Sequence, residues 1–265
     1  MIKAAEPEPS TTCVAPLAAA YGGGGVFGTA YGLGIAHALI DAGVPLASTP
    51  TIGTSAGSWV AACVATGIEF ESLCTAAPLH VPDPTPRLLQ SMATGFFGDA
   101  MAPLVTASAV TLPTMRRVLL AGDQFRLADM VAASSSVPAL FRPTQIAGTT
   151  YVDGGVRSLV SADLATPAAN LLVIAPIAGP MFGPGGRVME ALLSREIRRW
   201  ERTTGGVAHL IRPNSQIAAL ARHPLQLFDR DRARDAYFLA RAQAKRLLTQ
   251  REGLAKLCER PNQAA

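Results

Sequence analysis

The chain has 265 residues, of which 49% are hydrophobic and 16% charged, so it can bury the core of one large domain or two small ones. No apolar run reaches the roughly 18 residues that a membrane-spanning helix needs, and the acidic, proline-bearing segment 1–12 lacks the basic and apolar regions of a signal peptide. We therefore expect a cytoplasmic protein, with residues 1–12 as a disordered leader and residues 13–265 as a single domain.

The net charge of +4 is unevenly distributed. Residues 1–186 contain 7 Lys and Arg against 11 Asp and Glu, a net −4, whereas residues 187–265 contain 16 against 8, a net +8. Acidic residues are interspersed through the basic segment, so we interpret it mainly as solvated helix faces and expect no nucleic-acid partner. Transient contact with an anionic membrane surface is the alternative.

The four cysteines do not form a metal-binding pattern. Cys13, Cys63, Cys74 and Cys258 contain no Cys-x-x-Cys pair and have no nearby histidine. We expect isolated reduced or buried thiols and no metal site.

Strands and helices alternate along the first third of the chain. Apolar runs and helical spacing predict, in order, a strand over 14–21, a helix over 29–41, a strand over 49–52 and a helix over 58–66. Residues 78–113 are rich in proline, and we expect an irregular, partly helical insertion that covers a pocket.

The remaining elements continue this alternation. Helices are expected over 115–120 and 127–133, strands over 139–146, 149–152, 171–175 and 207–211, and basic helices over 188–202 and 229–250. A turn at Ala147-Gly148 separates the first two of these strands. The alternation predicts a mostly parallel sheet that is covered on both faces.

The segment Gly53-Thr54-Ser55-Ala56-Gly57 has the pattern of a nucleophile elbow. It follows the strand predicted at 49–52 and precedes the apolar helix at 58–66. A serine on such a sharp strand-to-helix turn is exposed at the top of a sheet, and the dipole of the following helix favours negative charge there. Ser55 is therefore a candidate nucleophile.

A serine nucleophile also needs donors for the oxyanion and a base. The backbone N–H groups of Gly23, Gly24 and Gly25 are candidate donors, because a loop without side chains lets a carbonyl oxygen approach closely. Asp153, in Tyr-Val-Asp-Gly-Gly at the end of a predicted strand, is the candidate base. The carboxyl ends of parallel strands meet at one edge of a sheet, so we expect Asp153 to reach Ser55 there.

Together these motifs resemble the patatin-like phospholipase family. The first three matching motifs are Gly-Gly-Gly-x-x-Gly ending at Gly28, Gly-x-Ser-x-Gly from Gly53 to Gly57, and Asp-Gly-Gly at 153–155, whose glycines are Gly154 and Gly155. The fourth match is the segment 132–143 (AASSSVPALFRP). The resemblance extends over about residues 14–212.

The resemblance implies a three-layer α/β/α sandwich and a metal-independent, cofactor-free hydrolase of lipid acyl esters. It implies a Ser55–Asp153 dyad without a catalytic histidine, with the glycine run as the oxyanion hole. The sequence departs from the family at Phe27, where a basic residue is frequent, and at Leu159 and Ser161, where Asn and Pro are frequent. An acyl chain would require an apolar pocket, for which Phe96, Phe97 and Phe141 are the main candidates, with Met92, Met101 and Leu104 as further ones.

Three alternatives stay open. Ser55, Asp153 and either His209 or His223 have the chain order of a Ser-His-Asp α/β-hydrolase triad. Gly23, Gly25 and Gly28 satisfy the Gly-x-Gly-x-x-Gly pattern of dinucleotide-binding domains, although the second strand does not end in the acidic residue that binds ribose. A non-catalytic protein that binds a lipid or a partner is the third alternative.

Overall fold

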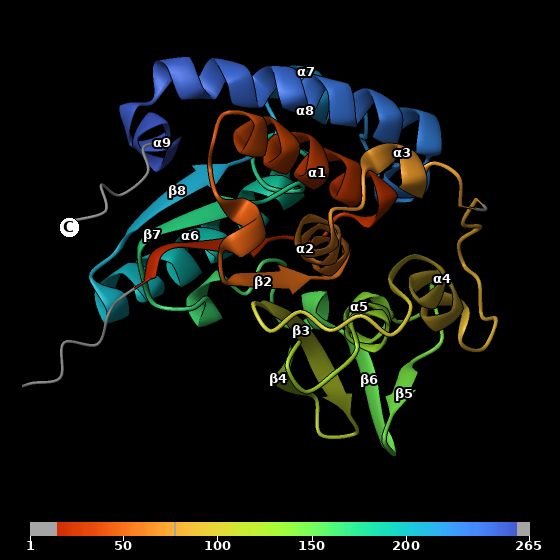
Figure 1. The fold of residues 1–265 in the computed structure, drawn as a ribbon. Coiled ribbons are helices and arrows are strands. Elements are labelled where there is room, and N and C mark those ends of the chain that lie inside the picture. The colour runs from red at the N-terminus through yellow and green to blue at the C-terminus, as the bar shows by residue number, and fades with distance from the viewer. Residues whose placement is uncertain (1–14, 77, 259–265) are drawn as a thin grey trace, which may run out of the picture.

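The computed structural model describes residues 15–76 and 78–258. The leader predicted at residues 1–12 lies outside them. The described residues form one eight-stranded sheet with helices on both faces, which is the three-layer α/β/α architecture expected from the sequence (Figure 1). No helix in this part of the chain is long and apolar enough to cross a bilayer.

The strands are β1 (Ala15–Tyr21), β2 (Thr51–Thr54), β3 (Val105–Leu112), β4 (Arg116–Ala121), β5 (Thr144–Ile146), β6 (Thr149–Asp153), β7 (Ala168–Ile174) and β8 (Val207–Ile211). Their order in the sheet is β5-β6-β3-β2-β1-β7-β8, with β4 also paired to β3. Strands β3, β2, β1, β7 and β8 are parallel, whereas β4, β6 and β5 join by antiparallel pairing.

The α-helices are α1 (Gly25–Asp41), α2 (Ala56–Thr66), α3 (Phe70–Leu73), α4 (Leu88–Phe97), α5 (Leu127–Ser135), α6 (Pro184–Thr204), α7 (Ser215–Ala218), α8 (Arg230–Gln250) and α9 (Glu252–Ala255). The short 3₁₀ segments are η1 (Leu46–Ser48), η2 (Gly154–Val156), η3 (Ala162–Leu164), η4 (Pro224–Phe228) and η5 (Lys256–Cys258).

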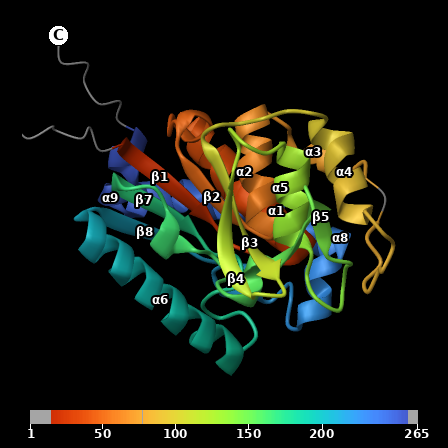
Figure 2. The same cartoon turned by 90° about the horizontal axis from the view of Figure 1, so that it is seen from below.

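Side chains on the two faces of the sheet enter two separate cores, because successive residues of a strand point to opposite faces. Tyr21 on β1 and Leu172 on β7 belong to the larger core with α1, α2, α5 and α8. Ala20 and Val173, their neighbours along the same strands, belong to a smaller core that α6 closes. Figure 2 shows α6 alone on its side of the sheet.

Helix α1 is buried on all sides between the sheet and α8. Eleven of its residues are buried, and α8 lies across it (Figure 1). Gly34 makes this contact close, since a Cβ at that position would overlap the Tyr237 carbonyl oxygen and lie 2.9 Å from Ala240 Cβ. Small residues on both helices therefore set the distance between α1 and α8.

The prolines around residues 105–112 predict an irregular insertion there, and this prediction is wrong. These residues form β3, an inner strand that pairs with β2, β4 and β6. The nearest prolines, Pro103 and Pro113, lie just outside the strand, where they remove no hydrogen bond of the sheet. Only α4 matches the helical part of the expected insertion.

Two further expectations are wrong in type or extent. Residues 115–120 were expected to be helical, but β4 occupies 116–121, because a short apolar run has no periodicity that separates helix from strand. The strand expected over 139–146 is limited to β5. Ala139 turns the chain with φ 67°, and Pro143 lacks the N–H that a strand would use.

We expect Gly34→Ala to lower the free energy of unfolding by about 1–3 kcal/mol, because the new methyl group forces α1 and α8 apart. Gly95→Ala is the matched control, since Gly95 lies in α4 and a Cβ there meets nothing within 4 Å. It should raise the free energy of unfolding by roughly 0.5–1 kcal/mol through its better helix propensity. Urea unfolding of both variants measures the difference, and equal stability of the two would contradict this account of the α1–α8 contact.

Candidate active site

Ser55 lies on the turn between β2 and α2 in a strained backbone conformation. Its φ and ψ are 54° and −124°, a region that costs a non-glycine residue on the order of 1–3 kcal/mol. The turn is tight enough that a Cβ at Gly53 would lie 2.5 Å from Ser58 Cα, and one at Gly57 would overlap the Tyr21 carbonyl oxygen. The two glycines of the motif therefore let α2 begin directly over the ends of β1 and β2.

Asp153 reaches the same place from another direction. Strand β4 occupies one edge of β3 from residue 106 to residue 111, so β2 and β6 share the other edge. Thr54 at the end of β2 is paired with Ser108, and Asp153 at the end of β6 is paired with Ala109. Because β6 is antiparallel to β3, the ends of β2 and β6 meet head to head. The two residues come together through this shared edge and not, as expected, through neighbouring parallel strand ends.

The Asp153 carboxyl group is buried, with 3% of the residue exposed. Its Oδ1 accepts a hydrogen bond from the Gly155 N–H at 2.6 Å, and its Oδ2 has no hydrogen-bond partner among the described residues. Burial raises the pKa of Asp153 from 3.8 to about 6, while the Ser55 hydroxyl and the Gly155 N–H lower it. A carboxyl with this pKa is mostly ionised at neutral pH and still basic enough to accept a proton.

The Ser55 hydroxyl is near enough to Asp153 to affect its pKa, but no direct hydrogen bond joins them in this structure. Such bonds between catalytic groups are often long without a substrate and shorten in the complex. The unpartnered Oδ2 can accept the Ser55 proton without breaking an existing hydrogen bond.

Buried serine hydroxyls hold the backbone around Ser55. Ser134 Oγ accepts a hydrogen bond from the Ser55 N–H at 2.9 Å and donates to the Ser108 carbonyl oxygen at 2.7 Å. Thr54 donates to Ser161 Oγ at 3.2 Å, and Ser161 donates to Ser108 Oγ at 2.9 Å. Nothing in the sequence predicts these roles, since serine is common in turns. The Ser161 departure from the family pattern therefore supplies a link between β2 and β3.

The glycine loop after β1 has two free N–H groups, not the three expected. The Gly23 N–H donates to the Leu159 carbonyl oxygen at 2.8 Å, so Gly23 is not an oxyanion donor here. The N–H groups of Gly24 and Gly25 donate to no described residue, and Gly25 lines the cavity beside Ser55. The Ala56 N–H, which the sequence did not single out, is likewise unpartnered at the start of α2.

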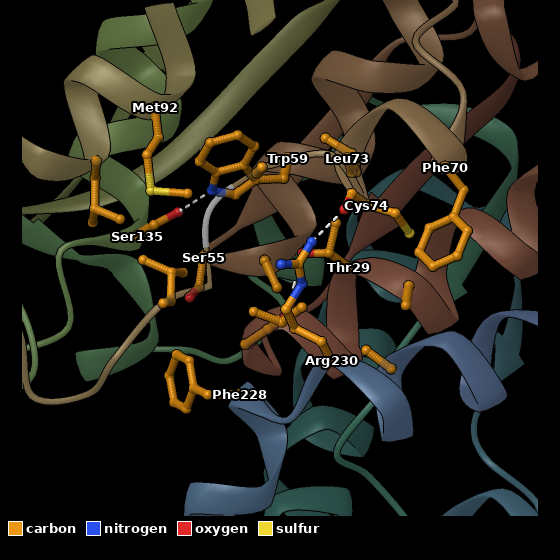
Figure 3. A pocket seen from close by; sticks show the side chains of 18 of the residues that line it. Thr29, Ser55, Trp59, Phe70, Leu73, Cys74, Met92, Ser135, Phe228 and Arg230 are labelled. Carbon is orange, nitrogen blue, oxygen red and sulfur yellow. Dashed lines mark hydrogen bonds between the residues drawn. The ribbon is translucent and has the colours of Figure 1, made fainter. Parts of the chain in front are cut away.

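Ser55 opens into a cavity of about 430 Å³ (Figure 3). Its apolar wall is formed mainly by Trp59, Leu89, Met92, Phe96, Val137 and Phe141. The Trp59 indole N–H donates to Ser135 Oγ at 3.1 Å, which fixes the ring against this wall. Ser55 is therefore accessible from a space that suits an apolar group.

Three of the six predicted pocket residues, Met92, Phe96 and Phe141, line this cavity. Phe97 does not, since the next position along α4 is rotated by about 100° and turns its ring into the core beside Trp59, with ring centroids 5.7 Å apart. Met101 and Leu104 are 50% and 44% exposed and lie outside the cavity lining.

No described histidine lines the cavity. His209 Nε2 lies 3.1 Å from Asn170 Oδ1, near the start of β7, and His223 precedes η4. His37 Nδ1 lies 3.0 Å from the Tyr237 hydroxyl. The described residues also contain no group of three or more His, Cys, Asp or Glu side chains that could hold a metal ion.

Comparisons with known proteins agree with the motif pattern. A family model described as patatin-like phospholipase matches residues 82–166, which confirms the predicted resemblance. This region contains Asp153 and the segment 132–143 but not Ser55. No curated protein matches the sequence.

Solved structures also match the chain. One is VipD from Legionella pneumophila, with 14% identity and a TM-score of 0.43. The match covers 87% of this chain and 66% of the VipD chain, so this chain spans a little less than two thirds of that protein.

We expect Asp153→Asn to stabilise the fold above pH 6. The folded state raises the pKa of Asp153, so it binds the proton more tightly than the unfolded state, and the wild type loses stability as pH rises from about 4 to about 6. The uncharged Asn avoids this loss, so its free energy of unfolding should exceed that of the wild type by about 2–3 kcal/mol at pH 8 and match it near pH 3.

Urea unfolding at pH 3, 5 and 8 measures this difference. Ser55→Ala is the control, because it retains the buried carboxyl group and should still lose stability as pH rises. The upper end of that loss should lie at a higher pH than in wild type, since the Ser55 hydroxyl that lowers the pKa of Asp153 is removed. A constant difference between Asp153→Asn and wild type across this range would show that the carboxyl group does not titrate as described.

Proposed function

We propose that the protein is a serine acyl hydrolase that cleaves lipid carboxylic esters with a Ser55–Asp153 dyad. The observation that carries the proposal is the unpartnered, buried Oδ2 of Asp153 beside a serine held on a strained turn at an apolar cavity. The match to patatin-like phospholipases over residues 82–166 supports the same chemistry.

The reaction proceeds in two halves. Ser55 Oγ attacks the ester carbonyl carbon as Asp153 Oδ2 takes its proton, and the N–H groups of Gly24, Gly25 and Ala56 are the candidate donors to the oxyanion. Asp153 then gives the proton to the departing alcohol, which leaves an acyl group on Ser55. In the second half, water attacks the acyl-enzyme and transfers a proton to Asp153, and Ser55 regains that proton when the carboxylic acid is released.

The apolar lining of the cavity is suited to the acyl chain of a lipid substrate. An acyl chain bound along Leu89, Met92 and Phe96 replaces water on an apolar surface, which contributes about 0.8 kcal/mol for each buried methylene group. A chain held there keeps the ester carbonyl next to Ser55. The apolar wall therefore binds the part of the substrate that the reaction does not change.

Contact with a membrane stays a proposal, and the two basic helices differ in their suitability. Helix α6 exposes Val188 and Leu192 among its arginines but covers the face of the sheet opposite to the cavity (Figure 2). Helix α8 supplies Arg230, Ala233 and Arg234 to the cavity lining. A bilayer that delivers substrate would therefore meet the α8 side of the molecule. The cytoplasmic location also stays a prediction.

The first test is labelling with a fluorophosphonate probe, which reacts with activated serines. Wild type should be labelled and Ser55→Ala should not. Asp153→Asn should label and hydrolyse a short-chain ester slower by a factor of about 10²–10⁴, because the general base is lost. Since this variant is expected to be at least as stable as wild type, the loss would not come from unfolding.

His209→Ala and His223→Ala are the controls for the triad alternative and should retain activity within a few-fold. A large loss in either folded variant would favour the triad. A folded wild type that neither takes the label nor hydrolyses esters would favour the non-catalytic binding protein.

The pH dependence gives a second test of the base. Asp153 must be ionised to accept the Ser55 proton, so kcat/KM should rise with pH, have its midpoint near the Asp153 pKa of about 6 and level off above about pH 7. Initial rates with a soluble p-nitrophenyl ester between pH 4.5 and pH 8 measure this profile. A midpoint near 4, the ordinary value for aspartate, would argue against a buried carboxylate as the base.

A further inference from the structure

Residues 158–162, which lead from η2 into η3, contact both parts of the candidate site. The Leu159 carbonyl oxygen accepts a hydrogen bond from the Gly23 N–H at 2.8 Å, and Ser161 Oγ accepts one from the Thr54 hydroxyl at 3.2 Å. Gly23 begins the glycine loop, and Thr54 immediately precedes the candidate nucleophile. This segment therefore links the glycine loop to the turn between β2 and α2.

Gly23 lies between this segment and Ser55. A Cβ built at Gly23 would lie 3.3 Å from Ser55 Cβ and 3.7 Å from the Leu159 carbonyl oxygen. Because the Gly23 N–H is bonded to Leu159, a shift of the segment moves the glycine loop with it. The free N–H groups of Gly24 and Gly25 would then change their position relative to Ser55.

The segment needs support from outside itself. Ser161 has a φ of 57°, which is unfavourable for a residue other than glycine, so further contacts must hold it. Its N–H donates to Ser158 Oγ at 2.7 Å, and the N–H of the next residue, Ala162, donates to Glu196 Oε2 at 3.1 Å. Glu196 belongs to α6, the helix on the opposite face of the sheet (Figure 2).

The Glu196 side chain lies on the inner face of α6. Leu193 and Trp200, which share this face, are 5% and 1% exposed. Burial raises the pKa of the Glu196 carboxyl group, and the Ser158 hydroxyl and the Ala162 N–H lower it. Both ends of the segment 158–162 therefore lie close to one carboxylate.

We propose that Glu196 is a positioning residue for the reaction. Its carboxylate holds residues 158–162, and through the hydrogen bond between Leu159 and Gly23 it sets the position of the Gly24 and Gly25 N–H groups. This inference rests on the proposed function for the role of those two groups as oxyanion donors. It gives α6 an effect on a cavity that this helix does not line.

Amide exchange of Gly23 tests the support without requiring catalysis. It is measured by NMR on the full chain with isotope-labelled glycine. Glu196→Ala removes the acceptor of the Ala162 N–H, so the Gly23 amide should exchange at least about tenfold faster than in wild type, the effect of losing one hydrogen bond to a charged group. Glu196→Gln keeps a side-chain oxygen at this place, and its exchange should stay within about threefold of wild type.

Glu201→Ala is the matched control on the same helix. Glu201 Oε1 accepts a hydrogen bond from the Ala208 N–H at 3.2 Å, which is the same kind of contact made to β8 instead of to residues 158–162. This variant should leave the exchange of Gly23 unchanged.

Replacement of Glu196 should not unfold the protein. Asp163 in η3 keeps its ion pair with Arg117 at 2.7 Å, so this part of the chain stays anchored. Glu196→Asp, which withdraws the carboxylate by one methylene group, provides the same comparison with a smaller change if Glu196→Ala does not fold.

Hydrolysis of a soluble short-chain ester provides a second measurement. Oxyanion donors stabilise the transition state and not the bound ester, so Glu196→Ala should lower kcat by a factor of about 10–100 and change KM by less than about threefold. Glu196→Gln and Glu201→Ala should retain kcat within about threefold. The folded fraction of each variant is measured by circular dichroism, so that unfolded protein is not counted as enzyme.

Four results would overturn the inference: wild-type exchange of Gly23 in folded Glu196→Ala, equally fast exchange in Glu201→Ala, a Glu196→Gln variant that behaves like Glu196→Ala, or faster exchange with an unchanged kcat. Failure of the proposed function is a separate outcome. In that case the Gly23 exchange responds as described, but wild type neither takes the fluorophosphonate label nor hydrolyses the ester.

Discussion

The arrangement of the site depends on how three strands divide the edges of β3. Because β4 fills one edge, β2 and β6 must use the other in succession, and their ends meet at Ser108 and Ala109. Hydrogen bonds of the sheet therefore fix the distance between Ser55 and Asp153, since each follows or ends a strand paired to β3. Two residues positioned by paired strands are held more rigidly than two residues positioned by loops.

The surroundings of Ser55 and Asp153 combine strain, burial and neutral hydrogen bonds. Ser55 stays in its unfavourable conformation because Ser134 binds its N–H, and the neighbouring Thr54 is tied to Ser161. Ser134, Thr54 and Ser161 are not among the groups that lower the pKa of Asp153, so they hold the turn without affecting it. Burial is then free to raise that pKa toward neutrality, at a cost in stability that the rest of the fold must offset.

Much of this could be predicted from the sequence where local pattern and tertiary structure agree. The Gly53–Gly57 motif predicts a turn between strand and helix because no other residues fit so close an approach. The role of β3 could not be predicted for two reasons. The flanking prolines indicate irregular structure, and the role of the strand depends on its pairing with strands that are distant in the sequence. The same holds for Gly23, whose N–H is bonded to a carbonyl group 136 positions further along the chain. Contacts between distant segments leave no local pattern, which is also why Arg230 could not be assigned to the cavity.

The two tryptophans of the chain lie in the two different cores of the molecule. Trp59 lines the cavity, whereas Trp200 belongs to α6, is 1% exposed in the core between α6 and the sheet, and has its N–H bonded to the Ala165 carbonyl oxygen. The fluorescence of each indole therefore depends on a different side of the sheet. The fluorescence of Trp59 should change when a ligand enters the cavity, and that of Trp200 should change when the layer on the opposite face unfolds. Ligand binding and unfolding can therefore be followed by the intrinsic fluorescence of the protein.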